Sequence, residues 1–276
     1  MLDPRRRLLA VAVLLLVTTG TTACGSGASP DATASTGPTA SPPPSAEPSE
    51  SAQEPSADPP PVATPPAPAP SPAFDRARLS IDDPTSIWVV TDKLRPLNPL
   101  DYVPGDLVDA AVPYVSNPQM RAEAAAAISA MFAAATAEGA GVLQIQNAYR
   151  SFSLQTSVHD RLVASLGAAA ADAQSARPGF SEHQTGLTAD VVGASGECSI
   201  DQCFGQTPEG LWIAANSWRF GYIVRYPEGK QDVTGYIYEP WHVRYVGTDL
   251  AREMHDRGIT TLEEFFELPA APDYAG

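Results

Sequence analysis

The segment Ser181-Glu-His-Gln-Thr-Gly-Leu-Thr-Ala-Asp190 is the stretch from which the rest of this sequence is best understood. It places an imidazole and a carboxylate seven residues apart, at His183 and Asp190. Gly186 between them permits a tight approach of the two side chains, because glycine adopts conformations that other residues avoid. Imidazole and carboxylate groups are both ligands of Zn²⁺. One such pair is weak evidence for a metal, since a lone histidine is more often a surface or hydrogen-bonded residue.

A second segment, Glu239-Pro-Trp-His-Val-Arg-Tyr245, brings a carboxylate and an imidazole three residues apart, at Glu239 and His242. Residues at that spacing on a regular strand face opposite sides of the sheet. Pro240 removes a backbone donor and holds the residue before it in an extended conformation, so we expect a kink or bulge there. Such a kink would bring Glu239 and His242 into one cleft. Beyond it, we assign three alternating side chains to the core: Trp241, Val243 and Tyr245.

The two segments together predict a catalytic zinc site. Two imidazoles and one carboxylate supply three protein ligands and leave a fourth position to water. The remaining carboxylate is then free to act as a general base on that water. Asp190 fits the role of ligand and Glu239 the role of base, although chemistry alone allows these roles to be exchanged. A structural zinc site is disfavoured, because such sites are closed by four protein ligands.

A third segment, Tyr149-Arg-Ser-Phe-Ser-Leu-Gln155, follows an alternating stretch that predicts a strand. Arg150 is either a structural ion-pair former or a clamp for a substrate carboxylate, which the planar guanidinium fits. Its place directly after a strand favours the clamp. His159 and His255 lack comparable neighbours in the sequence, and we interpret both as ordinary polar residues.

The hydrophobic patterns after residue 73 predict interleaved strands and helices. Strands are expected at residues 86–91, 142–148, 222–226 and 236–246. Helices are expected at residues 122–138, 153–171, 208–217, 249–257 and 262–266, with Asn117-Pro118 as a helix start. Regular βαβ spacing is missing from this order, which favours an α+β fold.

Residues 1–73 have the composition of an export signal followed by a linker. Three arginines at 5–7 and an apolar run at 8–17 predict a signal peptide over residues 1–23. That run is much shorter than the roughly 20 residues that span a bilayer as a helix. Small residues before Cys24 resemble the lipobox of bacterial lipoproteins, although Thr21 stands where leucine is usual. We predict lipidation at Cys24, with cleavage that leaves a free thiol as the alternative.

The linker is predicted for residues 24–73, which are rich in proline, serine and alanine and cannot bury enough apolar surface to fold. The formal net charge of −15 excludes general nucleic-acid binding, which needs a cationic surface. Cys198 and Cys203 enclose four residues. In an exported chain this spacing predicts a small disulfide loop rather than a metal site, and it differs from the Cys-x-x-Cys of redox proteins.

The three segments resemble motifs of the VanY-like D-alanyl-D-alanine carboxypeptidases, zinc peptidases related in fold to the Hedgehog signalling domain. The likeness covers roughly residues 83–268 and rests on YRS-x-x-x-Q at 149–155, SEHQTGL-x-x-D at 181–190 and EPWH-x-RYVG at 239–247. The resemblance implies Glu239 as the catalytic base and three zinc ligands: His183, Asp190 and His242.

The resemblance also implies that Arg150, as a catalytic residue, together with Gln155 and Ser181, contacts the substrate or the developing oxyanion. Two departures from the family pattern bear on substrate preference rather than on catalysis. Asn147-Ala148 stands where Ser-Gly is common, and Thr188 stands where alanine is common before the ligand aspartate.

The resemblance implies a single compact domain over residues 74–276, with a small antiparallel sheet packed by helices and a site for one Zn²⁺ in a cleft. It implies an enzyme that trims C-terminal D-alanine from peptidoglycan stem peptides. The alternatives are an LD-carboxypeptidase or peptidoglycan endopeptidase with the same zinc chemistry, and a non-catalytic wall-binding domain, which the intact site residues disfavour. We expect an exported monomer at the outer face of the cytoplasmic membrane or in the wall, held by a lipid at Cys24.

Overall fold

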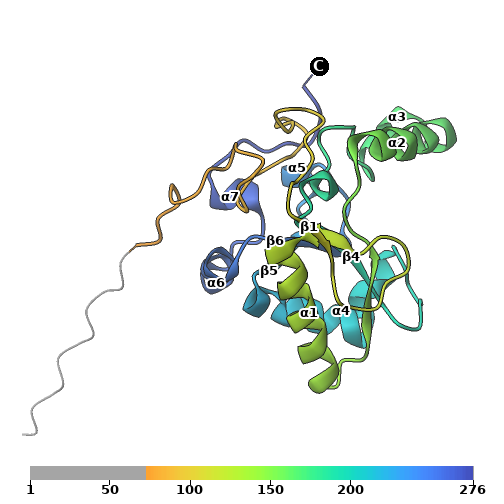
Figure 1. The fold of residues 1–276 in the computed structure, drawn as a ribbon. Coiled ribbons are helices and arrows are strands. Elements are labelled where there is room, and N and C mark those ends of the chain that lie inside the picture. The colour runs from red at the N-terminus through yellow and green to blue at the C-terminus, as the bar shows by residue number, and fades with distance from the viewer. Residues whose placement is uncertain (1–72, 276) are drawn as a thin grey trace, which may run out of the picture. The chain divides into compact units, whose positions relative to one another are not determined.

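The computed structural model of this protein describes residues 73–275 (Figure 1). The predicted signal peptide at 1–23, the predicted lipidation site Cys24 and the linker up to residue 72 lie outside the described residues. Within the described part, no helix combines the length and the apolar character that crossing a membrane requires.

A four-stranded antiparallel sheet forms the centre of the fold, in the strand order β3-β4-β6-β5. The strands are Leu143–Asn147 (β3), Thr188–Gly193 (β4), Glu239–Tyr245 (β6) and Tyr222–Tyr226 (β5). A separate pair joins β1, Leu107–Asp109, to β2, Gln119–Arg121. Because helices interleave with these antiparallel strands, the prediction of an α+β fold is confirmed.

Helices surround the sheet. The α-helices are Ala122–Ala137 (α1), Phe152–Leu166 (α2), Ala168–Asp172 (α3), Pro208–Asn216 (α4), Gln231–Thr234 (α5), Thr248–Arg257 (α6) and Leu262–Phe265 (α7). Three short 3₁₀ helices are Glu182–Thr185 (η1), Gln202–Gln206 (η2) and Ser217–Phe220 (η3). The predicted helix over 153–171 is interrupted at Gly167, whose φ of 82° is incompatible with a continuous helix.

The main core lies between α1 and one face of the sheet. Ile128, Met131 and Phe132, which recur at helical spacing, are buried against sheet residues such as Val191 and Val243. The predicted core side chains Trp241, Val243 and Tyr245 belong to this cluster. All residues of β4 and β6 are buried, so the opposite face of these two central strands is covered as well.

The predicted kink in the last strand is present. Val224 on β5 pairs with Val243 on β6, but Tyr226 pairs with Glu239, so two residues of β5 correspond to four of β6. This irregularity contains Pro240, which has no N–H for the ladder. As a result, Glu239 and His242 approach on one side of the sheet, with 3.5 Å between Oε2 and Nδ1.

Two local predictions are wrong. Residues 86–91 form no strand, because the backbone carbonyls of Ile87 and Val89 accept hydrogen bonds from the Arg244 guanidinium instead of from a neighbouring strand. Asn117 does not begin a helix. Its side chain bonds to the backbone of Gln119 and Tyr149, and β2 intervenes before α1 begins. The strand β4 was not predicted at all.

Candidate active site

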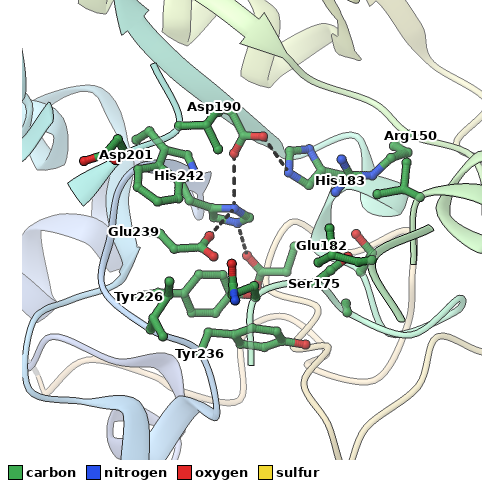
Figure 2. A pocket seen from close by; sticks show the side chains of 18 of the residues that line it. Arg150, Ser175, Glu182, His183, Asp190, Asp201, Tyr226, Tyr236, Glu239 and His242 are labelled. Carbon is green, nitrogen blue, oxygen red and sulfur yellow. Dashed lines mark hydrogen bonds and ion pairs between the residues drawn. The ribbon is translucent and has the colours of Figure 1, made fainter. Parts of the chain in front are cut away.

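A cleft of about 470 Å³ opens on the face of the sheet that is opposite the main core (Figure 2). It is lined by residues from β4, β5, β6 and η1, and by parts of α2 and of the segments around it. The sequence-predicted residues Arg150, Ser181, His183, Asp190, Glu239 and His242 all line this one cleft.

Three elements carry the predicted metal ligands. Asp190 on β4 is the direct cross-strand partner of His242 on β6, and antiparallel pairing places their side chains on the same face. His183 lies on η1, which ends at Gly186 in the left-handed conformation with φ of 68°. That turn leads the chain directly into β4 at Thr188, so His183 reaches back over Asp190.

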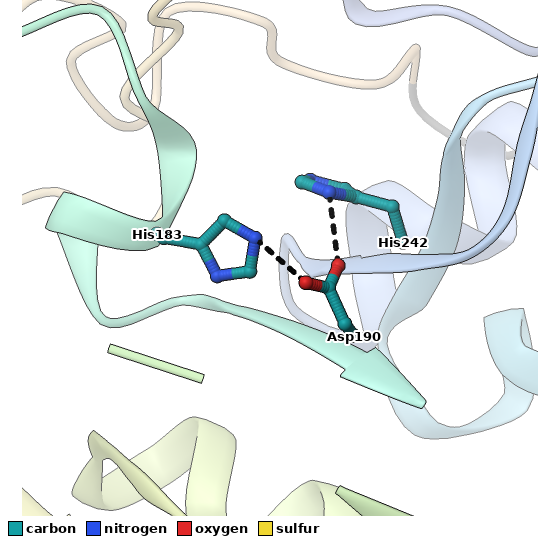
Figure 3. A group of neighbouring side chains, drawn as sticks. All are labelled: His183, Asp190 and His242. Atoms are coloured by element: carbon teal, nitrogen blue, oxygen red, sulfur yellow. Dashed lines mark ion pairs between the residues drawn. The ribbon is translucent and has the colours of Figure 1, made fainter. Parts of the chain in front are cut away.

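Figure 3 shows the two imidazoles on either side of the Asp190 carboxylate. His183 Nε2 is 3.3 Å from Oδ2, and His242 Nδ1 is 3.4 Å from Oδ1. One ligand atom from each of the three residues lies within 4.8 Å of the others, and all three residues are buried. Oδ1 of Asp190 approaches Nδ1 of His242 and has no other polar partner within the described residues, so it can also bind a cation.

The electrostatics of this group also suit a cation. Burial opposes the ionisation of Asp190, but His183 and His242 hold the pKa of its carboxyl below the usual value. Burial lowers the pKa of His183. Burial acts in the same direction on His242, yet hydrogen bonds to Asp190 and Glu182 raise its pKa to about 9. A divalent cation would replace the proton retained there, because metal ligands bind in their deprotonated forms.

Glu239 lies beside this group without belonging to it. Burial raises the pKa of its carboxyl to about 8, although the charges of His242 and Arg150 act in the opposite direction. A carboxyl that titrates near neutral pH in a cleft has the properties of a general acid or base. The structure therefore groups Asp190, and not Glu239, with the imidazoles.

Arg150 supplies a permanent positive charge in the cleft. Its backbone N–H donates to the His183 carbonyl at 3.2 Å, which fixes the Arg150 backbone beside the predicted metal ligands. Its Nε is buried without a hydrogen-bond partner, and burial lowers the pKa of the guanidinium. A buried, unpaired guanidinium N–H is a binding group for an anion.

Gln155 lies at the wall of the cleft. It does not line the cleft; its amide donates to the Ala176 carbonyl and the Ser175 hydroxyl, and these two residues do line it. Gln155 thus lies behind the cleft wall and supports it, and its direct contact with the substrate stays a prediction. Ser181 is buried and lines the cleft.

Several further residues of the cleft were not singled out from the sequence. The ring of Tyr226 lies 4.7 Å from that of His242 and 4.5 Å from that of Tyr236. Cys198 and Cys203 are disulfide-bonded, and the loop between them carries Asp201 to the rim of the cleft. Glu182 is buried within the first motif. Its position directly before His183, a predicted metal ligand, is the one feature of the sequence that could have drawn attention to Glu182.

Comparison with known proteins agrees with this geometry. The model of the VanY family, described as D-alanyl-D-alanine carboxypeptidase, matches residues 117–248. The putative carboxypeptidase YodJ of Bacillus subtilis is 39% identical over 193 residues, which cover 68% of this chain and 70% of YodJ. A D-alanyl-D-alanine carboxypeptidase of Enterococcus faecium is 35% identical, over 55% of this chain and 45% of that protein.

Solved structures extend the comparison. The LD-carboxypeptidase LdcB matches with a TM-score of 0.62 and 40% identity, over 67% of this chain and 87% of LdcB. A vancomycin-resistance D,D-pentapeptidase VanY, solved in complex with Zn(II), matches with a TM-score of 0.54 and 29% identity, over 66% of this chain and 98% of VanY. The chain therefore belongs to the VanY family of D-alanyl-D-alanine carboxypeptidases, and it is a peptidase of the hydrolase class.

Proposed function

We propose that this protein is an exported, zinc-dependent carboxypeptidase that removes the C-terminal D-alanine from peptidoglycan stem peptides. The observation that carries the proposal is the meeting of three kinds of group in one cleft. They are a buried His-Asp-His set, a carboxyl group whose pKa is raised, and a guanidinium with an unpaired N–H. Export and a lipid anchor at Cys24 are part of the proposal and rest on the signal-like sequence of residues 1–24.

His183, Asp190 and His242 would hold the zinc ion. The nitrogen and oxygen donors match those of catalytic zinc sites with three protein ligands. A VanY structure that resembles this chain was solved with Zn(II), which supports the choice of metal. A zinc ion bound there would polarise a peptide carbonyl and lower the pKa of a water molecule.

Glu239 would move the proton. Its carboxylate would take a proton from the water that attacks the peptide carbonyl, and would give it to the nitrogen of the departing D-alanine as the C–N bond breaks. Oε2 of Glu239 lies 3.5 Å from Nδ1 of His242, so the base is beside the metal-ligand group. The same carboxyl group can therefore serve both steps without moving far.

Arg150 would bind the terminal carboxylate of the substrate. A guanidinium that shares the cleft with Glu239 fits a peptide whose free carboxylate is close to the scissile bond. That arrangement is expected for removal of one terminal residue. A cross-link endopeptidase would not need a carboxylate site at this position.

A second specificity has support from the comparisons. LdcB, an LD-carboxypeptidase, is 40% identical to this chain, whereas the VanY structure is 29% identical. DD- and LD-carboxypeptidases both release a terminal D-amino acid and differ in the chirality of the residue before it. The likeness to LdcB makes LD specificity the second candidate.

Defined stem peptides test the proposal. The purified protein, loaded with zinc, is incubated separately with a pentapeptide that ends in D-Ala-D-Ala and with a tetrapeptide that ends in one D-alanine. The products are identified by mass spectrometry. We expect the pentapeptide to lose one alanine and a chelator to abolish the loss. Shortening of the tetrapeptide instead would assign LD specificity. Failure to cleave either peptide with zinc bound would refute the proposed activity.

A further inference from the structure

A buried carboxylate that the mechanism does not use faces His242 from the side opposite Asp190. Nδ1 of the imidazole is directed to Asp190, and Nε2 lies 3.4 Å from Oε2 of Glu182 (Figure 2). This separation is longer than the usual N–H···O distance, which is about 2.9–3.0 Å. Glu182 nevertheless provides the hydrogen-bond partner of Nε2 in the structure.

Glu182 is held rigidly. Its Oε1 accepts from Arg225 Nε at 2.8 Å and from Arg244 Nη1 at 2.9 Å. Arg225 is held in turn by both oxygens of Glu263, at 2.7 and 2.9 Å. Arg244 also donates to two backbone carbonyls of the segment before the first strand. Both guanidinium groups bind Oε1, so Oε2 remains directed at the imidazole.

Stability alone does not explain this arrangement. The side chains of Glu182, Arg225, Arg244 and Glu263 are all fully buried. Removing charges from water is costly, and buried ion pairs are often no more stabilising than apolar residues of the same size. The network does, however, fix one carboxylate oxygen beside one nitrogen of a predicted metal ligand.

We propose that Glu182 is a positioning residue for His242: it accepts the hydrogen bond of Nε2–H and so leaves the lone pair of Nδ1 to the metal site. His183 offers a comparison, because its Nδ1 lies 2.7 Å from the Ala148 carbonyl and its Nε2 faces Asp190. In both histidines the outer nitrogen meets a fixed acceptor and the inner nitrogen faces the site. Outer-shell acceptors of this kind orient metal-binding histidines. The inference rests on the proposed zinc site.

The substitution Glu182→Gln separates this role from simple packing. The two guanidinium groups will draw the amide oxygen to the position of Oε1, so the amide NH₂ will face Nε2 of His242. An acceptor thus becomes a donor, which favours the imidazole tautomer that opposes zinc binding. Glu263→Gln is the matched control, because it changes the same network without touching the imidazole.

Two measurements test the proposal. Zinc affinity, determined by competition with a chelator, should fall by about 10- to 100-fold in Glu182→Gln and much less in Glu263→Gln. The proton NMR signal of His242 Nε2–H should lie downfield in the wild-type protein, with or without zinc, and should move upfield or disappear in Glu182→Gln.

An equal loss of zinc affinity in both variants, or an unchanged affinity in Glu182→Gln, would overturn the proposal. A wild-type His242 signal without a hydrogen-bonded Nε2–H would overturn it even if neither variant folded. If the wild-type protein binds no zinc, the proposed function and the role of Glu182 toward zinc both fail, whereas a lost Nε2–H signal with zinc binding intact overturns only the role of Glu182.

Discussion

Asp190 and Glu239 are two carboxylates in the same cleft with opposite electrostatic behaviour. The imidazoles beside Asp190 keep its pKa below the usual value, while burial raises the pKa of Glu239 to about 8. Environments that separate the pKa values of two acids also separate their roles. The sequence alone left these two roles interchangeable, because it contains no information on which carboxylate meets both histidines.

The first prediction concerns proton transfer. Glu239→Gln keeps the size of the side chain but removes its ability to accept a proton. We expect kcat on the D-Ala-D-Ala pentapeptide to fall by about 10²- to 10⁴-fold, with zinc content unchanged. Asp201→Asn, which removes a carboxylate from the rim of the same cleft, is the control and should retain most activity. Full activity of zinc-loaded Glu239→Gln would refute the assignment of the base.

The second prediction concerns pH and the metal-free protein. The folded-state pKa of His242 is raised from 6.5 to about 9, so its stabilising contribution is complete below pH 6.5 and is lost as the pH rises through 9. The folded-state pKa of Glu239 is raised from 4.5 to about 8. The stability that the folded protein gains from keeping this carboxyl protonated is therefore lost as the pH rises from 4.5 to 8. As the pH rises, the free energy of unfolding therefore falls between pH 6.5 and 9 because of His242, and Glu239 adds to this fall up to about pH 8.

Urea denaturation of the metal-free protein measures this effect. The midpoint should be lower at pH 9 than at pH 6.5, and the difference should shrink when His242 is replaced by glutamine. A midpoint that rises with pH in this interval would contradict the assigned protonation of both groups. The protein is treated with a chelator beforehand, because a metal ion bound at the proposed site would displace the proton on His242.

At the scale of helices and strands, the features that could be predicted are those that depend on residues close together in the sequence. Pro240 disturbs its own strand, so the kink in β6 followed from one residue type. The strand β4 was not predicted because it is buried on both faces, which removes the alternation of apolar and polar residues that identifies a strand. Residues 86–91 have a strand-like pattern, but Arg244, which lies more than 150 positions later in the chain, donates hydrogen bonds to two of their backbone carbonyls. Contacts of this range have no local signal.

The third prediction concerns the turn between η1 and β4. Gly186 has φ of 68°, and a Cβ there would lie 2.9 Å from a methyl carbon of Leu107. Gly186→Ala should cost about 1–2 kcal/mol in backbone strain, and relaxation of this strain should shift the adjacent turn that carries His183 and weaken zinc binding. Gly196→Ala is the control, because Gly196 has φ of 73° with open space around it.

Chemical denaturation and chelator competition distinguish the two variants. Both should lose comparable stability from the positive φ, but only Gly186→Ala should lose zinc affinity. If the two alanine variants bind zinc equally well, the turn does not set the position of His183.

At the scale of the whole molecule, the site depends on elements that are distant in the sequence. The three predicted ligands come from η1, β4 and β6, and Glu182 reaches α7 through Arg225 and Glu263. The motifs pointed to the three predicted ligand residues because each motif carries its own chemistry, and the structure brings these residues together. The partners of Glu182 could not be predicted, because Arg225 and Glu263 lie in segments that look like an ordinary strand and an ordinary acidic helix.

The last prediction follows from this connectivity. A zinc ion held at the proposed site would join three elements of the folded chain and would not bind the unfolded chain in this way, so it would raise the free energy of unfolding. At a free zinc concentration 1,000 times the Kd, the gain is about 4 kcal/mol, which corresponds to a rise in Tm of roughly 8–16 °C for a domain of this size. Thermal unfolding with and without chelator measures the shift, and His183→Ala should remove most of it because only two ligands remain. If chelation leaves the Tm of the wild-type protein unchanged, zinc does not join these elements, and the three side chains must meet for another reason.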